Sequence, residues 1–177
     1  MLPSERFSSD RTTLVFLHFL GGSAEEWRWT IGWLTEAFRC LTIDLPGFGG
    51  AARTPGYAVA EMAELVADVI RSEAPRRWML VGHSMGAKVA TVLACRAEDG
   101  EEGLHGLARL VLLAGSPPGP EPMDESNRQA MMSWFSGDPE TCRAEARHYI
   151  DQNVGAKLDP AMDEQAVADV LRVDRAA

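Results

Sequence analysis

The sequence predicts an α/β fold, in which helices cover both faces of a doubly wound, mostly parallel sheet. Four short runs of apolar and β-branched residues alternate with stretches of helical periodicity. These runs lack the polar alternation of a half-exposed strand, which indicates strands that are buried on both faces. Their order, strand and helix in turn, favours one sheet with right-handed crossovers.

The expected elements of this core follow in chain order. Ser23 is expected to begin the first helix as its cap, with Glu26 as the capping-box partner three residues later. Trp29 and Trp33 lie four residues apart on that helix and are expected to pack against the sheet. Strands are predicted at residues 12–18, 40–45, 77–82 and 109–114, and helices at residues 24–38, 58–73 and 87–96.

The pattern changes after the proline-rich stretch that begins at Ser116. Three helices and no strand are predicted there, at residues 124–135, 139–153 and 160–175, and the last is still periodic where the sequence stops. We therefore divide the chain into an α/β core at residues 1–116 and a helical segment at residues 117–177.

Composition excludes some classes of function. The 177 residues suffice for one domain with a substantial core, and the formal net charge of -9 argues against nucleic acid or an anionic membrane as partner. The longest apolar run is too short to span a bilayer, and the first ten residues do not resemble a signal peptide. The three cysteines have no metal-ligand spacing and are expected to be buried, reduced thiols in a cytoplasmic protein.

The most specific motif is Gly82-His83-Ser84-Met85-Gly86, which lies between a predicted strand and a predicted helix. A serine in such a tight turn projects its hydroxyl above the carboxyl edge of the sheet, and side chains two residues away on either side would collide. The helix that follows directs its first amides at the same place, so the Met85 N–H can stabilise an oxyanion.

This motif and its setting resemble the nucleophile elbow of the α/β-hydrolase superfamily, in particular its small serine esterases and lipases. His18-Phe19-Leu20-Gly21-Gly22 is similar to the family's H-G-x-x-G segment, with Phe19 where the family usually has glycine. The resemblance implies that Ser84 is the nucleophile and that the Leu20 and Met85 amides form the oxyanion hole. The loop from Asp44 to Gly49 resembles the family's D-x-P-G-x-G loop, for which we expect a structural role.

The resemblance also implies a function. The segment after residue 116 looks like a helical cap, and the expected substrate is a small or medium carboxylic ester, cleaved without a metal or cofactor. Thioesters, lactones, amides and carbon–carbon bonds fit the same apparatus. The predicted cap has several large apolar side chains, which either line an acyl pocket or pack the cap on the core. They are Met123, Met131, Met132, Trp134 and Phe135.

The sequence differs from the family in its catalytic triad of serine, acid and histidine. In the family, the acid and the histidine follow the nucleophile in the sequence, on loops after later strands. Those strands would follow the cap, and this sequence stops within it. His18 is expected to brace the oxyanion segment, His83 to point away from Ser84, and His105 to lie at the amino edge. His148 is either a non-standard base or an exposed helix residue, and Lys88 is either a second base or a solvated charge.

A rival interpretation is a catalytically incomplete fragment or a pseudo-hydrolase binding module that needs a C-terminal complementing segment. The strand at residues 109–114 would then lie at an exposed sheet edge, and the chain is expected to associate through that edge.

Overall fold

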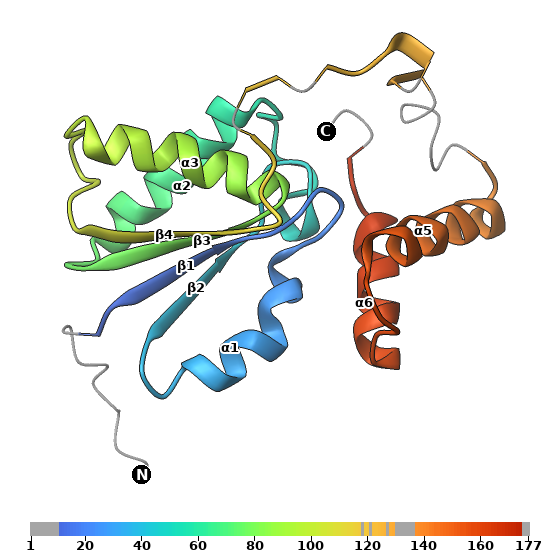
Figure 1. Cartoon of the computed structure of the whole chain (residues 1–177), viewed down its shortest axis with the longest axis horizontal. Coiled ribbons are helices and arrows are strands. Elements are labelled where there is room, and N and C mark those ends of the chain that lie inside the picture. Colours follow the sequence, from blue (N-terminus) through green and yellow to red (C-terminus); the bar gives the residue numbers. More distant parts are fainter. Residues whose placement is uncertain (1–10, 118, 121, 127, 130–136, 175–177) are drawn as a thin grey trace.

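The computed structural model describes residues 11–117, 119–120, 122–126, 128–129 and 137–174. Its centre is a parallel sheet of four strands in the order β2-β1-β3-β4, as Figure 1 shows. The strands are β1 (Thr13–Leu17), β2 (Arg39–Ile43), β3 (Trp78–His83) and β4 (Leu107–Leu113). The predicted α/β class and parallel sheet are confirmed, with strand bounds shifted by one or two residues.

Strand β1 shows why the strand sequences are uninterrupted apolar runs. Val15 and Leu17 pack into the core on the side of helices α2 (Val59–Glu73) and α3 (Met85–Glu98). Leu14 and Phe16 pack on the opposite side. Since successive side chains of a strand point to opposite faces, a strand covered on both sides must be apolar at every position.

The first helical stretch differs from its prediction. It divides into a 3-10 helix η1 (Ala24–Trp27) and a short helix α1 (Arg28–Leu34). Trp27 is buried, and Ile31 and Leu34 continue its face at helical spacing. Trp33 lies outside that face and is 88% exposed, so the prediction that Trp29 and Trp33 form the packing stripe is wrong for Trp33.

The strand order places the reversal of the sheet between β1 and β3. The chain runs from β1 to β2 on one side and returns to β3 on the other, with α1 and α2 on opposite faces (Figure 1). In a sheet of this kind, the loops after the strands on either side of the reversal form a crevice at the carboxyl edge. Those loops are the segments that follow β1 and β3.

Two helices of the last segment lie near that edge (Figure 1). Helix α5 (Pro139–Asn153) agrees with its predicted bounds, and α6 (Pro160–Val170) ends five residues before its predicted end. Each begins with proline after an aspartate whose side chain accepts amide hydrogen bonds, a favourable helix start. Of the helix predicted at residues 124–135, the structure describes helical backbone at 125–126 and 128–129, and the rest lies outside the described residues.

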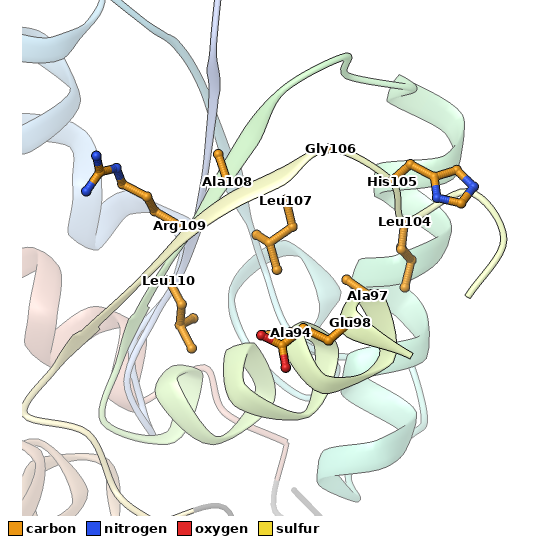
Figure 2. A pocket seen from close by; sticks show the side chains of 10 residues that line it. All are labelled: Ala94, Ala97, Glu98, Leu104, His105, Gly106, Leu107, Ala108, Arg109 and Leu110. Atoms are coloured by element: carbon orange, nitrogen blue, oxygen red, sulfur yellow. The ribbon is translucent and has the colours of Figure 1, made fainter. Parts of the chain in front are cut away.

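Strand β4 is an edge strand, as expected for residues 109–114. Its side chains Leu110, Val111, Leu112 and Leu113 are 36%, 39%, 47% and 43% exposed. Beside the start of β4, the side chains drawn in Figure 2 line an open hollow of about 500 Å³ between this strand and the end of α3. Both faces of the strand therefore have apolar side chains that are incompletely covered.

The cysteines only partly follow the expectation of buried thiols. All three are unpaired, but Cys142 alone is buried, while Cys40 is half-buried and Cys95 is exposed on α3. Burial raises the pKa of the Cys40 thiol. No helix among the described residues has the length and apolar character needed to cross a membrane.

Candidate active site

Ser84 lies at the junction of β3 and α3, in a backbone conformation that side-chain-bearing residues rarely adopt. Its φ is 49° and its ψ is -110°. The Ser84 amide donates to the Leu113 carbonyl (3.0 Å), and the Ser84 carbonyl accepts from the Ala87 amide (3.0 Å). Such strain costs about 1–3 kcal/mol and persists where the surroundings enforce it, commonly at functional sites.

The flanking glycines explain how the strain is enforced. A Cβ at Gly82 would lie 2.5 Å from the Gly86 carbonyl oxygen and 2.7 Å from the Ala87 Cα. A Cβ at Gly86 would lie 2.4 Å from the Leu17 carbonyl oxygen. These contacts are with backbone atoms, which cannot move aside easily. The glycine pair therefore brings the start of α3 against the end of β1, beside the loop that carries Leu20.

His18 holds that loop in place, in agreement with its expected bracing role. It is fully buried, its Nδ1 lies 2.8 Å from the Phe19 carbonyl oxygen, and its Nε2 lies 3.0 Å from the Leu45 amide nitrogen. A neutral imidazole meets both needs when Nδ1–H donates to Phe19 and Nε2 accepts from Leu45. The ring thus joins the loop after β1 to the loop after β2.

His18 should make stability depend on pH. Burial lowers the pKa of His18 below its ordinary value of 6.5. Above that pH the imidazole is neutral in both states, and below it the unfolded chain binds a proton that the folded chain resists. The free energy of unfolding therefore falls as pH decreases below 6.5.

We expect the variant His18→Gln to be less stable than the parent at neutral pH but to lose less stability between about pH 7.5 and about pH 5.5. Urea unfolding at both pH values measures this, with the same substitution at exposed His148, His148→Gln, as the control. An equal loss in His18→Gln and the parent would contradict the assignment of a neutral, buried His18.

Glu26 does not have the role predicted for it. Ser23 caps η1 by accepting from the Glu25 amide (3.2 Å), but Glu26 accepts from the Phe19 amide (3.1 Å) instead of completing a capping box. The other Glu26 carboxyl oxygen lies 2.5 Å from Nδ1 of His83. The spacing from Ser23 to Glu26 resembled a local cap, and only the tertiary structure shows these distant partners.

Helices α5 and α6 also contact the loop after β1. The Tyr149 hydroxyl donates to the Leu20 carbonyl (2.8 Å), and the Ser23 hydroxyl donates to the buried carboxylate of Asp169 (2.7 Å). Burial raises the pKa of the Tyr149 hydroxyl, which keeps it a proton donor. No motif in the sequence marked Tyr149 or Asp169, because neither has a characteristic spacing from the motifs at Ser84 and Leu20.

The other predicted site residues can now be placed. Leu20 lies half-buried in the turn after β1, and Met85 is the half-buried first residue of α3. Amides of a helix's first turn have no partner within the helix, so the Met85 N–H is suited to bind an anion. Asp44 has the expected structural role, since its carboxylate accepts from the Ala24 and Gly50 amides at 2.7 and 2.9 Å.

None of the four histidines is bonded to Ser84. His18 and His83 have the partners given above, and His105 lies beside the beginning of β3, where its carbonyl accepts from the Trp78 indole (2.9 Å). His148 is exposed on α5 and lies 2.8 Å from the Gln152 amide nitrogen, which favours the exposed-residue interpretation. The hollow in Figure 2 is at the amino end of β4 and is separate from the candidate site.

A parallel sheet with a strained serine at the turn after β3 and a braced, glycine-containing loop after β1 defines the class of α/β hydrolases. The chain belongs to the alpha/beta hydrolase family, whose model matches residues 14–177. It is 33% identical over 160 residues to the 2-succinyl-6-hydroxy-2,4-cyclohexadiene-1-carboxylate synthase of Klebsiella pneumoniae, a match that covers 88% of this chain and 60% of that enzyme.

Solved structures agree on the fold. An esterase from Exiguobacterium antarcticum matches 93% of this chain with a TM-score of 0.74 at 17% identity. MenH from S. aureus matches 93% with a TM-score of 0.67 at 20% identity. Each match covers 62% of the solved chain. The present chain thus spans about three fifths of the length of these relatives, and identities this low indicate the fold alone.

Proposed function

We propose that this chain supplies the nucleophile, the oxyanion hole and the cap of a serine hydrolase that cleaves a carboxylic ester. Ser84 attacks the ester carbonyl as a histidine takes its proton, and the Leu20 and Met85 amides bind the oxyanion. The ester's alcohol leaves with that proton, and water then hydrolyses the acyl-serine to release the acid and restore Ser84. The observation that carries the serine nucleophile, on which the proposal rests, is the strained Ser84 between two glycines that have no room for a Cβ.

The proposed reaction also needs a base and an acid. The base must be a histidine that approaches Ser84, and the four histidines of this sequence lie elsewhere or have other partners. We therefore propose that activity requires a polypeptide segment that supplies the acid and the histidine, as the rest of the fold does in the family. In this proposal α5 and α6 form the cap, since their side chains Tyr149 and Asp169 bond to the loop that carries Leu20.

A second candidate reaction is that of the synthase relatives. It is favoured by the 33% identity that extends across 88% of this chain. The solved esterases share only the fold at their lower identity, so sequence similarity favours the synthase reaction while the elbow alone favours neither.

One assay distinguishes the two reactions. The chain is joined to the C-terminal part of the Klebsiella synthase that the match leaves uncovered, and the fusion is tested with p-nitrophenyl esters and with the synthase substrate. We expect Ser84-dependent turnover of at least one of them, and the preferred substrate decides between esterase and synthase. If the folded fusion turns over neither while the intact Klebsiella enzyme turns over its own substrate, the proposed function is wrong.

A further inference from the structure

The Glu26 carboxylate joins two segments that are far apart in the sequence. Its Oε2 accepts from the Phe19 amide (3.1 Å), and its Oε1 lies 2.5 Å from Nδ1 of His83. A carboxylate offers acceptors only, so His83 donates through Nδ1–H. The Glu26 side chain is 18% exposed, which screens both bonds from water far more than at an open surface.

Each partner of Glu26 directly precedes a group of the proposed reaction. Phe19 precedes Leu20, whose amide is one half of the proposed oxyanion hole, and His83 precedes Ser84. The Phe19 carbonyl is held as well, by His18 Nδ1 (2.8 Å) and by the Gly22 amide (3.0 Å). Because the peptide unit is planar, fixing the Phe19 carbonyl also fixes the direction of the Leu20 N–H.

Ring contacts reinforce the same junction. The His83 ring lies 5.5 Å from the Phe19 ring and 6.5 Å from the Trp27 ring, centroid to centroid. Glu25 is a useful contrast, because its carboxylate lies 3.9 Å from Arg28 and the side chain is 54% exposed. An exposed pair of that kind contributes little, whereas Glu26 spans two segments with one rigid group.

We infer that Glu26 is a positioning residue, which fixes the oxyanion loop relative to the nucleophile turn. This inference rests on the proposed function for its catalytic consequence, since it assigns no chemistry to Glu26 itself. Catalysis of this type depends on donors aimed at the developing oxyanion, and a displacement of about 1 Å costs about 10²-fold in rate.

Two substitutions separate position from charge. Glu26→Asp keeps the charge but is one methylene too short to reach both partners. Glu26→Gln loses the charge but keeps the reach: its carbonyl accepts from Phe19, and its amide donates to His83, which exchanges tautomers. Glu25→Asp is the matched control, one residue away on the same 3-10 turn and outside the junction.

The first measurement is hydrogen exchange on the 177-residue chain, at residues 19–22 and 83–85. We expect faster exchange at both segments in Glu26→Asp, and parental exchange in Glu26→Gln and Glu25→Asp. The second is turnover in the same fusion with the C-terminal part of the synthase. We expect kcat to fall about 10–100-fold in Glu26→Asp with KM within about threefold, and Glu26→Gln to stay within about threefold of the parent.

The inference is overturned if Glu26→Asp keeps both parental exchange and parental kcat, or if Glu26→Gln is as impaired as Glu26→Asp, which would make charge the cause. A parent without Ser84-dependent turnover would defeat the proposed function separately. The exchange data would then decide alone: faster exchange at both segments in Glu26→Asp supports the coupling, and faster exchange at one segment or neither refutes it.

Discussion

Ser84→Ala is expected to lower ester or synthase turnover in the fusion by about 10⁵–10⁶-fold, down to the residual rate that binding and the oxyanion hole sustain. The substitution removes the hydroxyl oxygen that bonds covalently to the acyl group in the proposed reaction. His148→Ala should change turnover less than twofold, because His148 is exposed on α5 and lies against Gln152. A His148→Ala loss equal to that of Ser84→Ala would mean that His148 is the base.

A companion substitution separates lost chemistry from lost structure. Ser84→Gly also removes the hydroxyl, but glycine tolerates the φ of 49° that serine adopts under strain. We therefore expect Ser84→Gly to be as inactive as Ser84→Ala and more stable than the parent, by about 1–3 kcal/mol. Thermal unfolding of both variants measures this. A less stable Ser84→Gly variant would indicate that the conformation at Ser84 is not strained.

The largest expected effect on solution behaviour comes from β4. The 177-residue polypeptide is expected to self-associate and to be inactive toward esters. Four successive apolar side chains of β4 are 36–47% exposed, and no strand among the described residues lies beside the backbone of its outer edge. Full burial of one such side chain contributes about 1.5–3 kcal/mol, so the four together forgo several kcal/mol of a net stability of about 5–15 kcal/mol.

Charges on β4 should prevent the association, since lysine on an edge strand opposes pairing with another strand. We expect the double variant Leu112→Lys/Leu113→Lys to elute as a 19.3 kDa monomer, whereas the parent elutes as a larger species. Trp33→Lys is the control, because it removes an exposed apolar side chain from α1 and should elute like the parent. Size-exclusion chromatography with light scattering measures the masses, and a monodisperse, ester-cleaving parental monomer would contradict the prediction.

Much of the core could be predicted because its signals are local. Uninterrupted apolar runs reflect strands covered on both faces, and helical spacing reflects one buried stripe, so element order followed from the sequence alone. The elbow could also be predicted from the sequence, because the requirement for glycine at positions 82 and 86 is almost entirely local. A Cβ at Gly82 would collide with the start of α3, and a Cβ at Gly86 would collide with the end of β1. The catalytic assignments of Ser84, Leu20 and Met85 remain predictions that the assays above test.

Other features depended on the tertiary structure. The 3-10 turn Ala24–Trp27 places Trp27, rather than Trp33, against the sheet. A 3-10 turn has three residues per turn, so it changes which side of the following helix faces the sheet, and the spacing of apolar residues alone does not show this change. Glu26 looked like a capping residue because that motif needs only a three-residue spacing, yet its partners are Phe19 and His83.

The sequence by itself determined the α/β class, the order of the strands and helices, and the serine turn, because periodicity and steric exclusion act over a few residues. The tertiary structure decided which polar groups meet at the loop after β1: Glu26 with His83, Tyr149 with Leu20, and Asp169 with Ser23. These pairs join residues up to 146 positions apart. Such contacts arise when the sheet and helices pack, and a hydrogen bond between distant segments leaves no periodic trace in the chain.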